Sequence, residues 1–424
     1  MKRVVVSGLG LITSIGNSRA EVLRSLQQGL SGVELDSKLA EIKSPVKLAG
    51  TIKGFEFPEP DPQDWVLPET LQLSRSELRA TTPNVLFAYA AMQEAIAAAQ
   101  LTPELVSHAQ TGLHCASAGS PWLTHHNLSI ILERGPARCS PPAVIAGMPN
   151  SLHLNLVARY GIKGVSLAFS SACASSSHAL GHALDQIRLG RQNIIFVVGA
   201  EDCHPYNILP FASLRALSPQ TDPRLAPRAF DANRDGFVIT GGATVLVLEE
   251  LDHALARNAP IEAEVIGWGQ ASDGYDIVAP DPSGTGLSRA MELALADSGI
   301  THQEVDYINA HATATLAGDV AEMEAVSRVF GRTGRPLISS TKSLTGHGLS
   351  LAGAMEAAFS VLSVKEGFVP VSANIQDLDP AAAGLGVIQN PVELQPNVAI
   401  SNSSGFGGAN VCLAFRRFAN ELTP

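Results

Sequence analysis

Short apolar segments alternate with longer, helix-like segments along the whole chain, and this alternation constrains the fold more than any other feature. We expect buried strands at residues 4–7, 165–169, 194–198, 244–248, 261–266, 307–309, 336–339, 398–401 and 411–415. Between them, the apolar periodicity predicts helices at residues 83–99, 175–189, 286–298, 319–330 and 349–365. Strands that alternate with helices predict an α/β architecture, in which helices cover the faces of a sheet.

A weak internal repeat refines this prediction. Residues 165–198 run from a strand through a serine-rich turn ending in Cys173, then through a small-residue helix to a second strand. Residues 336–371 follow the same order, with Lys342 in the place of Cys173. A strand followed by a small-residue loop also occurs twice, before and after the middle of the chain. The repeat predicts two similar halves that form one body.

We place the two halves at residues 1–250 and 251–424. The repeated helices are rich in Ala, Ser and Gly, so they can pack closely against their neighbours, and we expect them in the middle of the molecule. The proline-containing segments 39–69 and 218–228 are expected to be excursions on the surface.

Composition excludes several classes of protein. Hydrophobic residues make up 45% of the 424 residues and charged residues only 16%, so the chain can bury enough apolar area to offset its ordering entropy. The formal net charge of −11 argues against a nucleic-acid-binding protein, which needs a clustered basic face. Low charge with abundant Gly and Ala also favours an oligomer, in which part of the surface is covered.

The five cysteines are widely scattered, and their spacing fits neither a disulfide framework nor a metal site. The apolar run near the amino terminus ends after Val4, Val5 and Val6, and no apolar segment reaches the roughly 20 residues of a membrane span. We therefore expect a cytoplasmic protein without a membrane span, and neither a metal nor an organic cofactor.

Cys173 is the first candidate for chemistry because of its position. It follows an apolar strand and directly precedes a helix, so the positive end of the helix dipole is expected to favour the thiolate. From position alone, a small buried core cysteine is an equally good interpretation.

Two histidines occupy comparable positions. His311 follows the strand at 307–309, and His347 follows Lys342 at the start of the second repeated helix. Loops that leave strands collect the active site in an α/β fold, so the pair favours catalysis beside Cys173, although either histidine alone would more often be structural. The glycine-rich segment 405–410 can offer backbone N–H groups to an anion, or can simply form a hairpin turn.

Together these motifs resemble the β-ketoacyl-acyl-carrier-protein synthases of the thiolase superfamily, in the family's order and over nearly the whole chain. The resemblance is carried by the following segments: Val4 to Gly10, Ser171-Ala172-Cys173-Ala174-Ser175-Ser176, Phe230-Asp231 through Arg234-Asp235-Gly236-Phe237, Asn309-Ala310-His311, Thr341 to His347, and Gly405-Phe406-Gly407-Gly408. Residues 237–257 look closer to the type I bacterial enzymes than to type II. The resemblance implies a thiolase-like, five-layered αβαβα fold made of two similar halves.

The resemblance also implies the reaction, a decarboxylative Claisen condensation of an acyl thioester with malonyl carrier protein. Cys173 would carry the acyl group, and its backbone N–H and that of Phe406, which also gates the acyl pocket, would hold the oxyanion. The other residues implied are His311 and His347 for the enolate, Lys342 and Glu356 for the electrostatic network, Thr313 and Thr315 for the phosphopantetheine arm, and Gly405, Gly407 and Gly408 for substrate binding.

The implied partners are acyl carrier protein, whose phosphopantetheine arm brings the substrates, and a second subunit. The second subunit would form either a homodimer or a heterodimer with a related ketosynthase or chain-length factor. Two alternatives remain: a thiolase-like acyltransferase that uses coenzyme A, and a non-catalytic partner subunit of a heterodimeric synthase.

Three departures from the family pattern bear on the substrate. Relatives often read His-Gly-Thr-Ser-Thr, where this chain has Ala312 and Ala314, and residues 348–352 differ from the usual small-residue run with a central glycine. Trp122, His125 and His126 lie in a segment that typically shapes the acyl tunnel. These changes leave the expected chemistry intact, but they argue against ordinary fatty-acid substrates. Beside fatty-acid synthesis, a specialised pathway such as polyketide or aryl-polyene assembly is therefore an open alternative.

Overall fold

The computed structural model describes residues 1–419, and within them a single mixed sheet of 11 strands runs through the molecule. Its order is β11-β10-β9-β12-β13-β8-β1-β7-β6-β4-β5. The strands are β1 (Val4–Ile12), β4 (Thr111–Ala116), β5 (Ser166–Phe169), β6 (Ile194–Glu201), β7 (Gly242–Glu250), β8 (Ala263–Ser272), β9 (Tyr307–Asn309), β10 (Leu337–Ser339), β11 (Gly386–Val387), β12 (Val398–Gly405) and β13 (Ala409–Arg416). A separate pair contains β2 (Val33–Leu35) and β3 (Leu48–Gly50).

The two halves of the sheet have the same topology, which confirms the predicted repeat. The first half has the order β5-β4-β6-β7-β1 and the second β10-β9-β12-β13-β8. In each half the first three strands are parallel and the last two join antiparallel. The halves meet where β1 pairs with β8 through Val5 and Val6. The division at residues 1–250 and 251–424 stays a proposal, and residues 420–424 lie outside the described chain.

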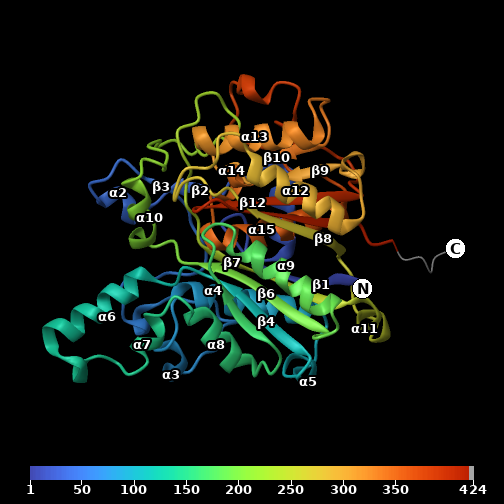
Figure 1. Cartoon of the computed structure of the whole chain (residues 1–424). Coiled ribbons are helices and arrows are strands. Elements are labelled where there is room, and N and C mark those ends of the chain that lie inside the picture. Colours follow the sequence, from blue (N-terminus) through green and yellow to red (C-terminus); the bar gives the residue numbers. More distant parts are fainter. Residues whose placement is uncertain (420–424) are drawn as a thin grey trace.

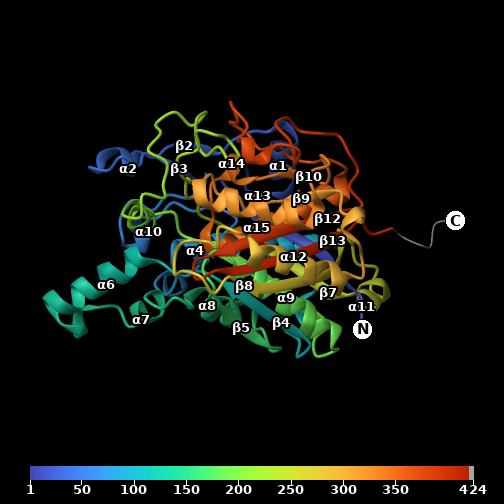
Figure 2. The same cartoon turned by 45° about the horizontal axis from the view of Figure 1, so that its top comes forward.

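Helices and sheet halves alternate in five layers (Figures 1 and 2). On the first outer face lie α4 (Pro83–Ala98), which packs on β1 and β7, and α8 (Ser151–Tyr160), which packs on β4. Between the sheet halves lie α9 (Ser175–Arg188) and α15 (Ala352–Glu366), which contact each other and strands of both halves. On the second outer face lie α12 (Thr285–Ser298), against β8 and β13, and α13 (Leu316–Phe330), against α12. The five-layered thiolase-like α/β fold is therefore confirmed.

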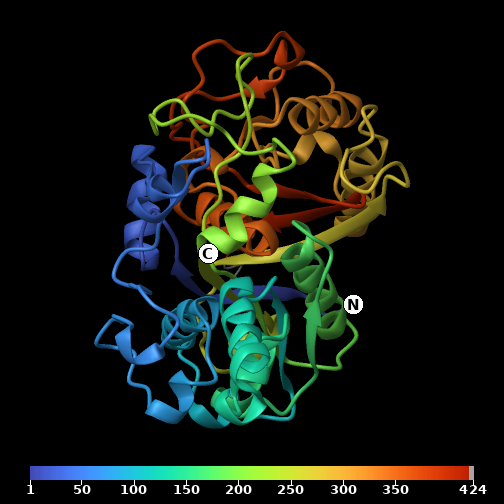
Figure 3. The same ribbon diagram turned by 90° about the vertical axis from the view of Figure 1, so that its left-hand side faces the viewer.

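Figure 3 shows the same layers from the side, with the first half below and the second half above. The remaining helices are α1 (Arg19–Gln28), α2 (Ser37–Glu41), α3 (Arg75–Leu78), α5 (Pro103–Val106), α6 (Pro121–Arg134), α7 (Ala143–Ala146), α10 (Pro205–Ala212), α11 (Leu251–Ala256) and α14 (Lys342–Thr345). The short 3-10 turn η4 (Leu349–Leu351) leads into α15. No helix among residues 1–419 is both long enough and apolar enough to cross a membrane.

The predicted strands and helices are present, but the interpretation of two segments was wrong. Leu39, Phe55 and Trp65 are buried, so the segment 39–69 packs into the molecule and forms more than a surface excursion. Ala226 and Arg228, in the segment 218–228, are buried as well. Prolines indicated loops correctly here, but they did not indicate whether the loops were exposed.

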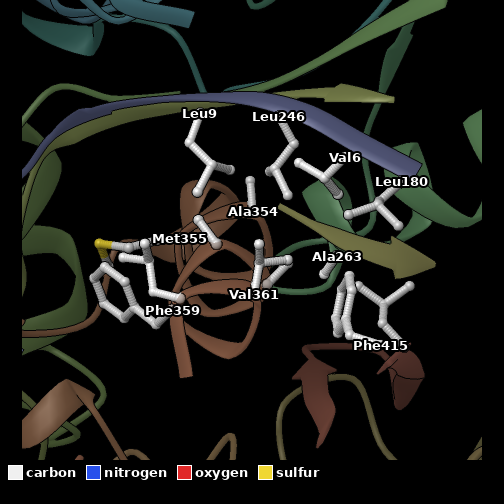
Figure 4. Close-up of a cluster of buried hydrophobic side chains, with 14 of the residues drawn as sticks. Val6, Leu9, Leu180, Leu246, Ala263, Ala354, Met355, Phe359, Val361 and Phe415 are labelled. Carbon is white, nitrogen blue, oxygen red and sulfur yellow. The ribbon is translucent and has the colours of Figure 1, made fainter. Parts of the chain in front are cut away.

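The central core surrounds α15, whose residues face both sheet halves. Figure 4 shows Ala354 and Val361 of α15 lying near Leu9 and Leu246 of the first half. Phe415 of the second half belongs to the same apolar cluster. Burying this apolar surface joins the halves, because it removes the inner faces of both from water.

The small residues of α9 and α15 allow the two central helices to approach closely. A Cβ atom added at Gly353 of α15 would lie 2.1 Å from Ser177 Oγ and 2.8 Å from Ser177 N of α9. The Ser177 hydroxyl is itself fixed 2.8 Å from the hydroxyl of Ser403 in β12. Neither Ser177 nor Ser403 can move away without disturbing a packed layer.

We predict that Gly353→Ala destabilises the protein by about 1–3 kcal/mol, because overpacking outweighs the better helix propensity of alanine. Thermal unfolding measures the loss as a lower midpoint. Gly147→Ala is the matched control, since its Cβ would have no neighbour closer than 3.5 Å. Equal midpoints for the two variants would contradict close packing of α9 on α15.

Candidate active site

Three loops at the ends of strands bring the predicted residues together. Cys173 lies between β5 and α9, His311 follows β9, and His347 lies between α14 and η4. The turn between β12 and β13 contains Phe406. Because β5 and β10 hold equivalent places in the two halves, the cysteine loop and the Lys342 loop both point toward the centre of the molecule.

The loop before Cys173 is held in an unusual backbone conformation. Ala172 has a φ of 50°, a left-handed region that costs a residue with a side chain roughly 1–2 kcal/mol. The Ser175 hydroxyl accepts from the Ser171 N–H at 2.8 Å and donates to the Ala172 carbonyl at 2.6 Å. These bonds stabilise the sharp turn that places the thiol at the start of α9.

The thiol contacts one histidine, and the two histidine rings pack against each other. His347 Nε2 lies 3.1 Å from Cys173 Sγ. The rings of His311 and His347 are nearly perpendicular, with centroids 5.3 Å apart, and Phe237 packs edge-on against His347 at the same separation. The sequence-predicted triad is therefore assembled in space.

Behind the triad, Lys342 and Glu356 form a buried ion pair. The side chain of Lys342 is 1% exposed and that of Glu356 is fully buried, and the ammonium Nζ contacts Glu356 Oε1. Burial and the nearby Lys342 ammonium lower the pKa of His311 and of His347 well below the ordinary value. Both imidazoles are therefore neutral at neutral pH, and each has one N–H donor and one free nitrogen acceptor.

The expected thiolate is not supported by the electrostatics of Cys173. Burial raises the pKa of the thiol to about 12, and the Lys342 ammonium opposes this effect without overcoming it. Desolvation of the sulfur is larger than the opposing effect of Lys342, so the thiolate that the helix dipole was expected to favour is not the form that the surroundings of Cys173 stabilise. A neutral thiol beside a neutral His347 is the resting state of the site.

The loop that contains His311 is held in place by residues that the sequence did not indicate. Glu322 of α13 accepts hydrogen bonds from the backbone N–H groups of His311 and Ala312, at 3.0 and 2.6 Å, and from Asn402 at 3.0 Å. Asp319, one turn earlier, accepts from the N–H of Ala314 at 3.1 Å. The sequence contained one signal for this role: Asp319 and Glu322 lie three positions apart on the buried face of an apolar helix.

Two cavities meet at Cys173. The first, which we call the histidine cavity, has a volume of about 290 Å³. Its lining includes Cys173, His311, His347, Thr313, Thr315, Gly405 and Phe406. The hydroxyls of Thr313 and Thr315 lie 3.2 Å apart in its wall.

The second, which we call the Glu201 cavity, has a volume of about 300 Å³. Its lining includes Cys173, Phe211 and Phe406 together with Pro121, Ser170, Glu201, Asn207, Pro210, Leu349 and Ser350. Cys173, Phe211 and Phe406 border both cavities, so these residues separate them.

Of the three glycines predicted to bind substrate, only Gly405 lines the histidine cavity, and none of the three lines the Glu201 cavity. A Cβ at Gly405 would lie 2.5 Å from the Ser171 carbonyl oxygen and 3.2 Å from Cys173 N, so glycine lets this turn approach the cysteine loop. Gly407 and Gly408 have φ of 78° and 73° and form the hairpin turn itself. The hairpin interpretation of this segment is therefore confirmed, while its approach to a ligand stays a prediction.

The segment expected to shape the acyl tunnel contributes to the Glu201 cavity through Pro121. Trp122 instead stacks on His204 with ring centroids 4.2 Å apart, and His125 packs beside Tyr206, which lines the cavity. Within residues 1–419, no three His, Cys, Asp or Glu side chains are grouped so that they could hold a metal ion.

The five-layered fold and a buried cysteine that faces two histidines define a thiolase-superfamily condensing enzyme. Comparison with known proteins identifies the family. Residues 1–254 match the model of the beta-ketoacyl synthase N-terminal domain, and residues 262–376 match that of its C-terminal domain. The chain belongs to the β-ketoacyl synthase family, and it is an acyltransferase of fatty-acid or polyketide biosynthesis.

Several relatives are similar over their full length. The chain is 42% identical to the 3-oxoacyl-[acyl-carrier-protein] synthase 1 of Haemophilus influenzae, covering 99% of this chain and 100% of the relative. It is 39% identical to the synthase of the same name from Escherichia coli, covering 98% and 99%. A crystal structure of a β-ketoacyl synthase from Burkholderia phymatum aligns with a TM-score of 0.89 and 34% identity, covering 99% and 100%.

We predict that alkylation of Cys173 by iodoacetamide accelerates with rising pH to beyond roughly pH 9, because the thiol ionises only at high pH. The Cys173→Ala variant measures the contribution of the other four cysteines. A rate that levels off between roughly pH 6 and 8 would reveal a preformed thiolate and contradict the neutral resting state.

Proposed function

We propose that the protein is a 3-oxoacyl-[acyl-carrier-protein] synthase that joins an acyl group to a malonyl unit through an acyl-Cys173 intermediate. The contact of 3.1 Å between His347 Nε2 and Cys173 Sγ, at the meeting point of two cavities, carries this proposal. One cavity can hold the acyl chain while the other admits the incoming thioester arm.

In the first half-reaction, Cys173 Sγ attacks the carbonyl carbon of the acyl thioester, and His347 accepts the thiol proton. The backbone N–H groups of Cys173 and Phe406 stabilise the tetrahedral oxyanion. The bond to the phosphopantetheine sulfur then breaks, and that sulfur leaves as the thiol with the proton that His347 returns. A sulfur nucleophile suits this step because it both attacks and leaves readily.

In the second half-reaction, the malonyl thioester carbonyl accepts hydrogen bonds from His311 and from His347, whose ring at this stage must be in the tautomer that carries its proton on Nε2. The bond to the carboxylate breaks, carbon dioxide leaves, and the electron pair forms an enolate held by the two N–H donors. The enolate carbon attacks the acyl-Cys173 carbonyl, the carbon–sulfur bond breaks, and the Cys173 thiolate takes up one proton from solvent, which is the proton that decarboxylative condensation consumes. Neutral imidazoles suit this role because their N–H groups donate hydrogen bonds but are too weakly acidic to protonate the enolate.

The remaining residues support these steps. Lys342 and Glu356 form the buried pair that keeps the histidines neutral. Thr313 and Thr315 line the wall of the histidine cavity, where they would contact the phosphopantetheine arm. Phe406 is 37% exposed and borders both cavities, so a movement of its ring would open or close the way between them. We further propose that Gly405, Gly407 and Gly408 supply the flexible turn that allows this movement.

We propose acyl carrier protein and a second subunit as partners, and the cytoplasm as the place of action. A solved structure described as a type II polyketide acyl-carrier protein in complex with its ketosynthase is 26% identical to this chain and has a TM-score of 0.86. The ishigamide ketosynthase/chain length factor is 29% identical, with a TM-score of 0.88. Strand β5 lies at one end of the sheet and exposes Leu167, which gives a second subunit an edge to pair with.

Two alternative functions are less well supported by the structure than the proposed one. A thiolase-like enzyme would need a second cysteine as base, and in the described chain Cys173 is the one cysteine that lines the histidine cavity. A non-catalytic partner subunit would not need an intact nucleophile, whereas this chain keeps Cys173 beside His347.

We predict that incubation with an acyl carrier protein carrying a saturated acyl chain adds the mass of that acyl group to Cys173. Intact-protein and peptide mass spectrometry locate the modification, and Cys173→Ala must abolish it. A folded wild-type protein whose Cys173 stays unmodified, with modification elsewhere or none, would rule out the acyl-Cys173 mechanism.

We predict that His311→Ala lowers the rate of carbon dioxide release from malonyl carrier protein by about 10²–10³-fold, because one enolate donor is lost. Acylation of Cys173 should continue at nearly the wild-type rate, since His311 is not the residue in contact with Sγ. Labelled malonyl carrier protein measures the first rate and mass spectrometry the second. Equal losses in both half-reactions would contradict the assigned role of His311.

A further inference from the structure

The Glu201 cavity exposes mainly apolar atoms, but its wall includes several hydroxyls together with one carboxyl and one amide side chain. Pro121, Pro210 and Leu349 belong to the apolar part. Glu201, the last residue of β6, is fully buried, and Asn207 of α10 is 5% exposed. An apolar cavity with a few buried polar groups is the usual form of a specific binding site.

Each of these side chains keeps one oxygen without a hydrogen-bond partner. Glu201 Oε1 accepts from the Ala118 N–H at 3.0 Å and from the hydroxyl of Ser350. Glu201 Oε2 and Asn207 Oδ1 are buried and have no partner within residues 1–419. Leaving a buried polar atom unpaired is costly, so both oxygens are expected to be satisfied by whatever occupies the cavity.

The charge state of Glu201 determines what it can bind. Burial raises the pKa of the Glu201 carboxyl to about 8, so it is mostly protonated at neutral pH. Because Oε1 already accepts two hydrogen bonds, the proton belongs on Oε2. Glu201 can then donate to a carbonyl oxygen, while Asn207 Oδ1 can accept from a hydroxyl.

We propose that the Glu201 cavity selects an acyl chain that carries a carbonyl or hydroxyl oxygen, with Glu201 and Asn207 as the specificity-determining residues. The inference rests on the proposed function, in which the chain is attached to Cys173 and extends into this cavity. A keto group accepts from Glu201, and a hydroxyl group donates to Asn207. A saturated chain of the same length leaves both oxygens unpaired and is therefore the poorer substrate.

The test compares two kinds of acyl carrier protein. The first carries a saturated six-carbon chain. The second carries a six-carbon chain with one keto or one hydroxyl group, which is placed at each position of the chain in turn. The readout is kcat/KM for acylation of Cys173, followed by mass spectrometry. We expect the best oxygenated chain to be preferred over the saturated one by roughly tenfold, the usual contribution of one or two satisfied hydrogen bonds.

Variants show which residues cause the preference. In each variant we compare kcat/KM for the oxygenated chain with kcat/KM for the saturated chain and take the ratio of the two. Asn207→Leu and Glu201→Met, which keep the size of the side chain but remove its polar atoms, should bring the ratio toward one. Glu201→Gln keeps a donor and an acceptor and should keep the preference. Pro210→Ala, an apolar position in the same wall, is the matched control and should leave the ratio unchanged.

The outcomes separate the inference from the function on which it rests. If no acyl chain modifies Cys173, the proposed function is wrong. If saturated and oxygenated chains modify wild-type Cys173 equally well, the function stands and the selection for oxygen is wrong. The wild-type comparison decides this point even if a variant at Glu201 fails to fold. If the preference persists in Asn207→Leu and Glu201→Met, other residues cause it, and the proposal is wrong.

Discussion

A buried ion pair between Lys342 and Glu356 sets the electrostatics on which the active site depends. Taking two charges out of water costs roughly several kcal/mol per ion, and their attraction only partly repays this cost. The pair is nevertheless placed behind both histidines, with neither side chain more than 1% exposed. Burial lowers the pKa of His311 and of His347, and the Lys342 cation lowers it further, so both stay neutral, which is the state in which they can stabilise an enolate.

The duplicated topology explains how the charge and the nucleophile come together. Cys173 follows β5 and Lys342 follows β10, and these strands hold equivalent places in the two halves. Each residue leads into a slim central helix, and the close approach of α9 to α15 depends on small residues such as Gly353. The same repeat that builds the fold thus delivers a sulfur from one half and an ammonium from the other to one buried centre.

Sequence alone predicted the strands, the central helices, the two halves and the cluster of Cys173, His311 and His347, because periodicity and strand exits are local signals. It did not indicate Glu322, Glu201 or Asn207, whose importance comes from partners far away in the chain. The thiolate was wrongly expected at Cys173 because a helix start is visible in the sequence, whereas the burial that raises its pKa is a property of the packed molecule. Segment 39–69 was misjudged for the same reason, since its prolines do not tell which apolar side chains are covered.

Both active-site histidines are neutral and lie beside a neutral thiol, and the proposed mechanism depends on this protonation state. Nitrogen-15 NMR of the histidine rings tests it most directly, with signals assigned through the His311→Asn and His347→Asn variants. We expect both rings to show one protonated and one unprotonated nitrogen throughout the range from roughly pH 5 to 8. An imidazolium signal from either ring at roughly pH 7 would contradict it.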